Sequence, residues 1–311
     1  MHRTKDIRWT HGISLRDFVT QLGSVGFQSV EVYRAAQAIV KMKKAGAKIF
    51  LTFTSNMVTS GLRGLFAQCI ELGLADAIIT TVGGIEEDIM KAHGDEFVIG
   101  SFHSDDVSLH EKGFNRVGNL MISNESYAKF EAMMLPLLKQ LYKKKPRHSV
   151  SEMLFEFGKT LTDNNSILFQ AAKRNVPVFC PAITDGALGF HLFLFQQKHP
   201  DFVVDVVQDF KNLLTSMSHD ELKGLIALGG SISKHHAILG ALLNGGLDYA
   251  VYMSTARAGS GSMSGATTQE AKSWGKIKDD ADAVTVTGDV SIVFPLALML
   301  ACEQLREDNI I

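Results

Sequence analysis

The chain has 311 residues, of which 46% are hydrophobic and 21% are charged, and its formal net charge is −2 at pH 7. These values are typical of a globular protein that buries a substantial core without needing disulfides or a metal. Because the charge is nearly balanced, there is no global basic field, and binding to nucleic acid or to an anionic membrane is not expected.

The first part of the chain alternates helices with strands. Its charged N-terminus lacks an apolar core and predicts no signal peptide. Helices are predicted after Ser14, which can cap the first, and over residues 30–44, and a buried strand is predicted over 48–53. This strand leads into the small and hydroxyl residues 54–61. Open α/β sheets bind ligands at such strand ends, although an ordinary helix cap explains the pattern equally well.

The same order of strand, small-residue turn and helix recurs. Residues 76–82 form a predicted strand before Gly83 and Gly84, and the acids 86–88 follow at a predicted helix start. A helix dipole favours acids there, and they are also placed to hold a cationic substrate. Further strands, each ending in a polar or glycine turn, are predicted over 176–182, 225–228, 248–254 and 283–287.

The middle of the chain is less regular. Residues 95–119 carry many charges and glycines, and 114–119 are predicted as a loop. An amphipathic helix is expected over 124–141. The basic stretch 143–148 is predicted to be a solvated connector, with contact to an acidic partner as the alternative.

The second half completes the alternating pattern. The glycine- and serine-rich loop 259–265 is either a lid over a ligand or a simple connector. The final helix is predicted to be capped by Ser291, and its apolar run 292–302 is too short to span a bilayer. Helices are also expected over 150–161 and 166–174, and a strand-like run over 202–207.

About seven strands alternating with helices predict an α/β protein with a mostly parallel, Rossmann-like sheet and helices on both faces. No linker, internal repeat or low-complexity tract divides the sequence, so residues 1–311 are predicted to form a single domain. Cys69, Cys180 and Cys302 lie far apart without metal-ligand spacing. They predict free thiols, no metal site and a cytoplasmic location.

Several residues in the turns at the ends of the predicted strands should meet at one edge of the sheet, where a dinucleotide would lie. They are Ser55, Thr81, Val82, Gly83, Asp185, Gly230, Thr255 and Asp289. Four nearby charged or titratable side chains could hold a cationic substrate: Glu86, Glu87, Glu270 and His235.

Lys276 stands two residues after Trp274. An ammonium with a pKa of about 10.4 is not a nucleophile, but an indole that excludes water from it favours the free amine. Such an amine can form a Schiff base, and the indole also offers a face to a cationic substrate. A lysine on an ordinary solvated segment is the alternative. Together with a hydride carrier, this lysine suggests oxidation of an amine to an imine.

Seven motifs in collinear order resemble deoxyhypusine synthase, and the resemblance runs from about Arg8 to the C-terminus. The motifs are Thr54–Asn56, Gly83–Asp88, Thr184–Gly186, Lys234–His236, Tyr249–Tyr252, Ser273–Lys276 and Val293–Leu296. The chain lacks the N-terminal extension of eukaryotic members, and so it resembles the shorter archaeal or bacterial type.

The resemblance implies an NAD-dependent transfer of a 4-aminobutyl group. Family members oxidise spermidine with NAD to an imine, and the lysine that matches Lys276 takes the butyl part and releases 1,3-diaminopropane. The group then passes to a lysine of translation initiation factor 5A, where the retained hydride reduces the new imine. The family is a homotetramer with sites at subunit interfaces, so the loop 259–265 could serve a neighbouring subunit.

By position, the resemblance implies catalytic roles for Lys276, His235 and Glu87. It implies that NAD is bound by Ser55, Asn56, Met57, Val58, Thr59, Thr81, Val82, Gly83, Glu87, Asp185, Gly230, Thr255, Ala256 and Asp289. It implies that the amine is bound by Glu86, Glu87, His235, Gly261, Ser262, Met263, Glu270, Trp274 and Lys276.

Two positions depart from the family pattern. Eukaryotic members carry aspartates where this chain has Phe190 and Met263, and an aspartate would neutralise a substrate amine. The length or terminal group of the donor therefore stays open. The alternatives are homospermidine-synthase-like transfer to a small amine such as putrescine and the use of a donor such as agmatine. A non-catalytic protein that binds NAD or a partner is a third, which the intact Lys276, Trp274 and Glu270 disfavour.

Overall fold

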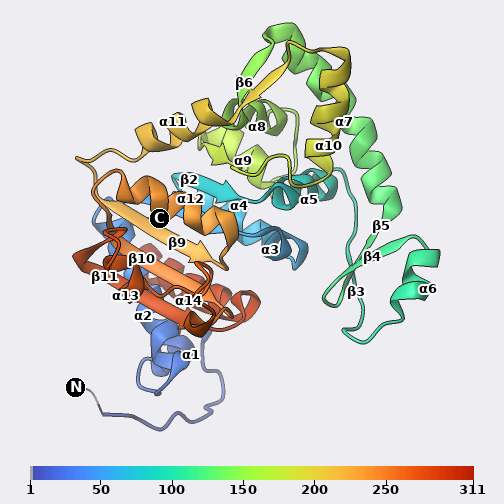
Figure 1. Cartoon of the computed structure of the whole chain (residues 1–311). Coiled ribbons are helices and arrows are strands. Elements are labelled where there is room, and N and C mark those ends of the chain that lie inside the picture. Colours follow the sequence, from blue (N-terminus) through green and yellow to red (C-terminus); the bar gives the residue numbers. More distant parts are fainter. Residues whose placement is uncertain (1–2) are drawn as a thin grey trace. The chain divides into compact units, whose positions relative to one another are not determined.

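The computed structural model describes residues 3–311, which form an α/β fold (Figure 1). A six-stranded sheet has the hydrogen-bonded order β11-β10-β9-β1-β2-β7. Its strands are β1 (Lys48–Phe53), β2 (Ala77–Thr80), β7 (Val178–Phe179), β9 (Lys223–Leu228), β10 (Leu247–Ser254) and β11 (Ile277–Thr287). The pairs β1–β9, β9–β10 and β10–β11 are parallel, as predicted.

The chain divides into two compact units. The first takes in the chain up to Phe53, Leu72–Ile79 and Asn212–Ile311, and the second takes in Thr54–Glu71 and Thr80–Lys211. Because the chain passes between the units several times, no single linker in the sequence marks the division. That residues 1–311 act as one domain stays a prediction.

Apolar strands form the centre of the first unit. Phe50 on β1 pairs in register with Leu225 on β9, and both side chains are fully buried. Such continuous apolar runs suit strands of a parallel sheet, which is covered on both faces. Helices α2 (Gln28–Lys44) and α12 (Ser231–Leu242) both pack against β1, β9 and β10. The remaining helices of this unit are α1 (Leu15–Leu22), α13 (Thr268–Lys272) and α14 (Val290–Glu307), with a 3-10 turn η1 (Ala258–Ser260).

Helices make up most of the second unit. They are α3 (Ser55–Thr59), α4 (Arg63–Glu71), α5 (Val82–Ala92), α6 (Asp106–Glu111), α7 (Asn124–Lys144), α8 (Val150–Gly158), α9 (Ile167–Arg174) and α10 (Ala187–Lys198), and α11 (Val206–Ser216) continues into the first unit. The buried face of α7 carries Phe130, Met134, Leu138 and Leu141, which confirms the predicted amphipathic helix.

Two small sheets of the second unit were not predicted as sheets, although the predicted strand-like run over 202–207 contains β8 (Val203–Asp205), a strand of one of them. The expected loop 114–119 is wrong, because β4 (Phe114–Val117) and β5 (Leu120–Ser123) form a hairpin, to which β3 (Val98–Ile99) adds a third strand. Gly118 makes the turn possible with φ +63°. The hairpin strands are only four residues long and carry polar side chains, so their hydrophobic pattern is weak.

The basic stretch 143–148 is also not a simple loop. Helix α7 continues to Lys144, and β6 (Arg147–Ser149) pairs with β8 (Val203–Asp205). Its side chains form ion pairs within the unit: Lys144 with Glu156, Lys145 with Glu152, and Arg147 with Asp205. The charged side chains of this stretch therefore stabilise the fold of the second unit.

Three predicted boundaries need correction. The strand expected over 176–182 shortens to β7, because Pro177 and Pro181 have no N–H to donate to a ladder. The last strand begins earlier, at Ile277. The cap of α14 is Asp289 rather than Ser291, because the Asp289 carboxylate accepts hydrogen bonds from both the N–H and the hydroxyl of Ser291.

Candidate active site

The predicted site residues fall into two groups, one in each unit. The first unit holds Gly230, His235, Thr255, Ala256, Gly261, Ser262, Met263, Glu270, Trp274, Lys276 and Asp289. The second unit holds Ser55, Asn56, Met57, Val58, Thr59, Thr81, Val82, Gly83, Glu86, Glu87 and Asp185.

Lys276 lies at the tight turn between α13 and β11. Thr267 caps α13 by accepting a hydrogen bond from the N–H of Glu270, and the N–H of Thr268 donates to the hydroxyl of Thr285 on β11. Gly275 then turns the chain with φ +67°, a conformation that favours glycine. Helix and turn together fix the direction from which the lysine side chain leaves the backbone.

The amine of Lys276 is buried beside an indole and a thioether. Only 4% of the lysine is exposed, and its Nζ atom lies 4.7 Å from the Trp274 ring centroid and 3.8 Å from Sδ of Met263. Burial lowers the pKa of the Lys276 ammonium, and the negative charge of Glu270 opposes part of that effect. A lysine in this setting supplies more neutral amine than a solvated one, and neutral amine is the form that attacks an imine or carbonyl.

The other predicted residues of the first unit have simpler surroundings. His235 is exposed at the start of α12, and Thr255, Gly261 and Ser262 are exposed near the loop after β10. Among residues 3–311, no hydrogen bond joins His235 to Lys276. One carboxylate oxygen of Asp289 is occupied by the cap of α14.

In the second unit, the turns before α3 and α5 approach each other closely. The N–H of Ser55 donates to the hydroxyl of Thr81 at 2.9 Å. A Cβ atom at Gly83 would lie only 2.9 Å from Cβ of Ser55, so a larger residue there would push the two turns apart. Within this unit, the predicted nucleotide-binding turns at Ser55 and at Thr81–Gly83 therefore lie against each other.

Behind these turns, Glu87 is a buried carboxyl with two partners. The hydroxyl of Thr59 donates to Oε2 of Glu87 at 2.6 Å. Burial raises the pKa of Glu87 to about 7, although Thr59 and the positive charge of Lys91 oppose the shift. The Nζ atom of Lys91 donates to the carbonyls of Val58 at 2.7 Å and Thr59 at 3.1 Å. Lys91 thus anchors the end of α3 and sets the charge around Glu87.

Glu86 and Asp88 do not stand in the first turn of their own helix, as the sequence had predicted. Helix α5 begins at Val82, so the acids fall in later turns and cap other helices. Glu86 accepts a hydrogen bond from the N–H of Leu188 at 2.7 Å, in the first turn of α10. This contact occupies one oxygen of a carboxylate that the sequence had assigned to the substrate amine.

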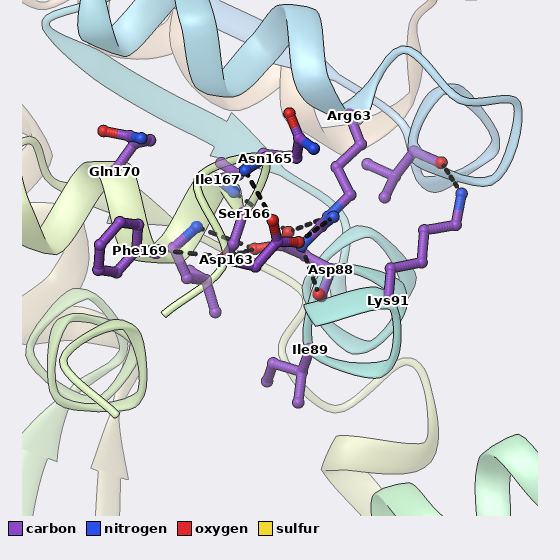
Figure 2. A network of polar contacts seen from close by, with 12 residues as sticks. Arg63, Asp88, Ile89, Lys91, Asp163, Asn165, Ser166, Ile167, Phe169 and Gln170 are labelled. Carbon is purple, nitrogen blue, oxygen red and sulfur yellow. Dashed lines mark hydrogen bonds and ion pairs between the residues drawn. The ribbon is translucent and has the colours of Figure 1, made fainter. Parts of the chain in front are cut away.

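Asp88 forms a buried network that joins α4, α5 and the start of α9 (Figure 2). Its carboxylate pairs with Nε of Arg63 at 2.5 Å and accepts hydrogen bonds from the hydroxyl of Ser166 and the N–H of Leu168. Arg63 also pairs with Asp163 at 2.7 Å. Asp88 is therefore a structural residue, and it supports the helix that carries Glu86 and Glu87.

Asp185 and Phe190 lie at and just after the turn that precedes α10. Asp185 is exposed, and Phe190 is 57% exposed on α10, where its ring lies 5.9 Å from that of His191. A Cβ atom at Gly186 would lie 2.6 Å from Oε1 of Glu86, so a larger residue there would displace that carboxylate.

The family model for deoxyhypusine synthase matches residues 17–301, nearly the whole chain. The chain belongs to the deoxyhypusine synthase family. Relatives named probable deoxyhypusine synthase in Schizosaccharomyces pombe and Thermococcus kodakarensis are 36% and 38% identical. These matches cover 92% and 91% of this chain and 86% and 89% of the relatives. The resemblance drawn from the seven motifs is confirmed.

A solved structure supports the family placement of the fold. A protein from Entamoeba histolytica that is assigned to the deoxyhypusine synthases superposes with a TM-score of 0.69 at 29% identity, covering 95% of this chain and 96% of that chain. The α/β architecture is thus shared along nearly the full length of both proteins.

Sequence reasoning missed two lysines of this deoxyhypusine synthase family member: Lys91, which is half-buried, and Lys234, which is buried. Lys91 and Lys234 lie on helix faces where a lysine is usually solvated, and only the folded chain brings their Nζ atoms to backbone carbonyls. Lys91 lies outside the seven motifs, and in the motif 234–236 the functional role was assigned to His235.

Within residues 3–311, histidine, cysteine and acidic side chains form no cluster that could hold a metal ion. None of its helices combines the length and apolarity required to cross a membrane.

Proposed function

We propose that this protein transfers a 4-aminobutyl group from spermidine, through an imine on Lys276, to a lysine of translation initiation factor 5A. The observation that carries the proposal is that Lys276 is a buried residue whose Nζ atom lies beside the Trp274 ring and the Met263 thioether. The lowered pKa of this amine suits nucleophilic attack. Membership of the deoxyhypusine synthase family supports this reaction.

The proposed cofactor is NAD, and the turn before α5 fits a dinucleotide. Thr81 precedes α5 but makes no side-chain cap hydrogen bond, which leaves the N–H groups of Val82 and Gly83 for an acceptor. A helix N-terminus with such donors suits a pyrophosphate, and the close packing of Gly83 on Ser55 keeps the turn free of side chains. The residues predicted to bind NAD remain our proposed ligands.

Bound NAD would supply the oxidation, because it accepts the hydride that a donor amine loses when it becomes an imine. The neutral amine of Lys276 would then attack the imine carbon and form a new C–N bond. The C–N bond to the 1,3-diaminopropane part breaks, and that amine leaves with a proton. Glu87, with a pKa near neutrality, and the exposed His235 are the groups we propose for holding and releasing protons.

The acceptor lysine would next displace Lys276 from its imine, which returns the enzyme amine to its starting state. Return of the hydride would reduce the imine on the acceptor, so the overall transfer needs no outside oxidant. We further propose a homotetramer in the cytoplasm with the sites completed at subunit interfaces.

A mass measurement tests the proposal. Purified protein, NAD, spermidine and the cognate translation initiation factor 5A are incubated, with parallel tubes that contain putrescine in place of the factor, or agmatine in place of spermidine. A gain of one aminobutyl group on one lysine of the factor is the expected result. Homospermidine with an unmodified factor, or reaction with agmatine alone, would overturn the proposed acceptor or donor.

A further inference from the structure

Lys234 is a buried cation inside the first unit. It lies on α12 with 2% exposure, and its Nζ atom is 4.1 Å from the ring centroid of Tyr252 on β10. The same Nζ atom donates hydrogen bonds to the carbonyls of Met263 at 3.1 Å and Ala266 at 2.8 Å. Both acceptors belong to the loop between β10 and α13, so the lysine links α12 to that loop.

A cavity lies next to this loop. A cavity of about 190 Å³ lies among Lys234, Tyr252, Thr285 and the loop residues 256–258 and 264–267. Because side chains do not fill this space, hydrogen bonds contribute to the position of the loop. Besides the two bonds from Lys234, the hydroxyl of Ser264 accepts one from the N–H of Ser231 at 3.0 Å.

Met263 connects this anchor to the proposed nucleophile. Its carbonyl is held by Lys234, and its Sδ atom is 3.8 Å from Nζ of Lys276. A shift of the loop backbone at Met263 would displace the thioether from the amine beside it. Lys234 is thus linked to Lys276 through one residue, Met263.

We propose that Lys234 is a positioning residue, whose hydrogen bonds to the carbonyls of Met263 and Ala266 hold the loop so that the Met263 side chain covers Lys276. The inference rests on the proposed function only in that Lys276 is the proposed nucleophile. In this motif the sequence pattern assigned a catalytic role to His235, whereas the geometry assigns the positioning role to its neighbour Lys234.

The surroundings of Lys234 predict how its loss would change the pKa of Lys276. Burial lowers the pKa of Lys234 to about 8; the charge of Glu270 opposes this shift, and the charge of Lys276 adds to it. The other titratable groups near it are the Tyr252 hydroxyl and Arg257, which lines the same cavity. Loss of Lys234 would release the loop and expose Lys276 to water, which raises the pKa of Lys276.

Lys223 offers a matched control in the same unit. It is also fully buried, and its Nζ atom also donates to two backbone carbonyls, those of Ser218 at 2.9 Å and Glu221 at 3.0 Å. It stands at the beginning of β9, whereas Gly230 and α12 follow the end of that strand. Substitution of either lysine by methionine removes a comparable buried ammonium, but only Lys234 holds the loop.

The test measures the ionisation of Lys276 directly. Wild type, Lys234→Met, Lys234→Gln and Lys223→Met are labelled at pH 6 to 11 with limiting acetic anhydride, and mass spectrometry of the Lys276 peptide gives the pH midpoint. We expect Lys234→Met to raise the midpoint by roughly one pH unit, so that labelling at pH 7 falls about tenfold. Lys234→Gln should also raise the midpoint, and this variant tests the positioning role if Lys234→Met does not fold. Lys223→Met should keep the wild-type midpoint.

A second arm separates this inference from the proposed function. The same proteins are incubated with NAD and spermidine and then treated with borohydride, which traps an aminobutyl imine on Lys276. Wild type that forms no adduct overturns the proposed function, whatever the labelling shows. If wild type forms the adduct but both Lys234 variants have the same midpoint as Lys223→Met, the positioning role alone is overturned.

Discussion

The Sδ atom of Met263 lies 3.8 Å from the Nζ atom of Lys276. An uncharged thioether thus occupies the position next to the proposed nucleophile where the family motif led us to expect a carboxylate. A carboxylate would favour the ammonium by charge, whereas a thioether favours the neutral amine by excluding water. Burial is accordingly the largest cause of the lowered pKa of Lys276, the proposed nucleophile.

Substitution of Met263 by aspartate should weaken the nucleophile at neutral pH. A carboxylate within about 4 Å raises the pKa of a neighbouring ammonium by roughly 1 to 3, so the neutral fraction of Lys276 at pH 7 should fall about tenfold or more. The rate of imine trapping on Lys276 should fall by the same factor at pH 7 and recover towards pH 10. Met263→Leu is the control, because it has a similar volume and no charge. Equal pH profiles for the two variants would show that Met263 does not act on Lys276.

Substitution of Lys276 by alanine should remove transfer while the protein keeps its fold. Loss of a covalent nucleophile costs about a thousandfold or more in rate, because the remaining groups cannot replace the bond that it forms. Product formation is followed by mass spectrometry, and NAD binding and oligomer mass should stay close to wild type. Lys272→Ala serves as the neighbouring control, since its Nζ atom only donates to backbone carbonyls of β11. Normal transfer by Lys276→Ala would assign the nucleophile to another residue.

Glu87 should make the second unit less stable as the pH rises. Its folded-state pKa of about 7 is above the ordinary value of 4.5, so the folded state holds a proton that the unfolded state releases between these pH values. Stability from this group is therefore present below pH 4.5 and is lost as the pH rises through 7, by an amount approaching about 3 kcal/mol. Glu87→Gln removes the titration and keeps an acceptor for the Thr59 hydroxyl.

The measurement compares thermal unfolding of wild type and Glu87→Gln at pH 5 and pH 8 without NAD. The variant should gain midpoint temperature relative to wild type at pH 8, and the gain should shrink at pH 5. Glu96→Gln, at an exposed position, should follow wild type at both values. A constant difference between Glu87→Gln and wild type would contradict a buried titrating carboxyl.

The elements that the sequence predicted correctly are those whose signal is local. The apolar run at 48–53 is β1, and Ser14 caps α1 through the N–H of Asp17. The nearness of Lys276 to Trp274 was also readable, because the two residues are two positions apart in the chain. Fold class and the lysine–indole pair therefore followed from sequence patterns of a few residues.

The parts that could not be predicted depend on contacts between distant segments. Glu86 caps a helix that begins about 100 residues later, and Asp88 caps one about 80 residues later. The positions of these two acids in the sequence suggested only an interaction with the dipole of their own helix. Lys234 was missed for the same reason, since its acceptors at Met263 and Ala266 become neighbours only when the loop after β10 folds back.

The Arg63–Asp88 pair should be much more important to stability than a surface pair of similar geometry. Arg63 is 7% exposed and Asp88 is fully buried, so Arg63→Met leaves a carboxylate without its counter-charge. Such a loss typically costs about 3 to 5 kcal/mol, and the remaining hydrogen bonds from Ser166 and Leu168 place the expected value near the lower end. Urea unfolding of the two proteins measures the difference.

Arg116→Met is the matched control, because Arg116 pairs with both carboxylate oxygens of Asp106 on the exposed hairpin side of the same unit. Water can solvate Asp106 after that change, so the unfolding midpoint should stay near wild type. The double variant Arg63→Met with Asp88→Asn separates charge from packing. A neutral amide no longer needs a buried cation, so part of the lost stability should return. A double variant as unstable as Asp88→Asn and Arg63→Met added together would mean that the pair acts through shape rather than through charge.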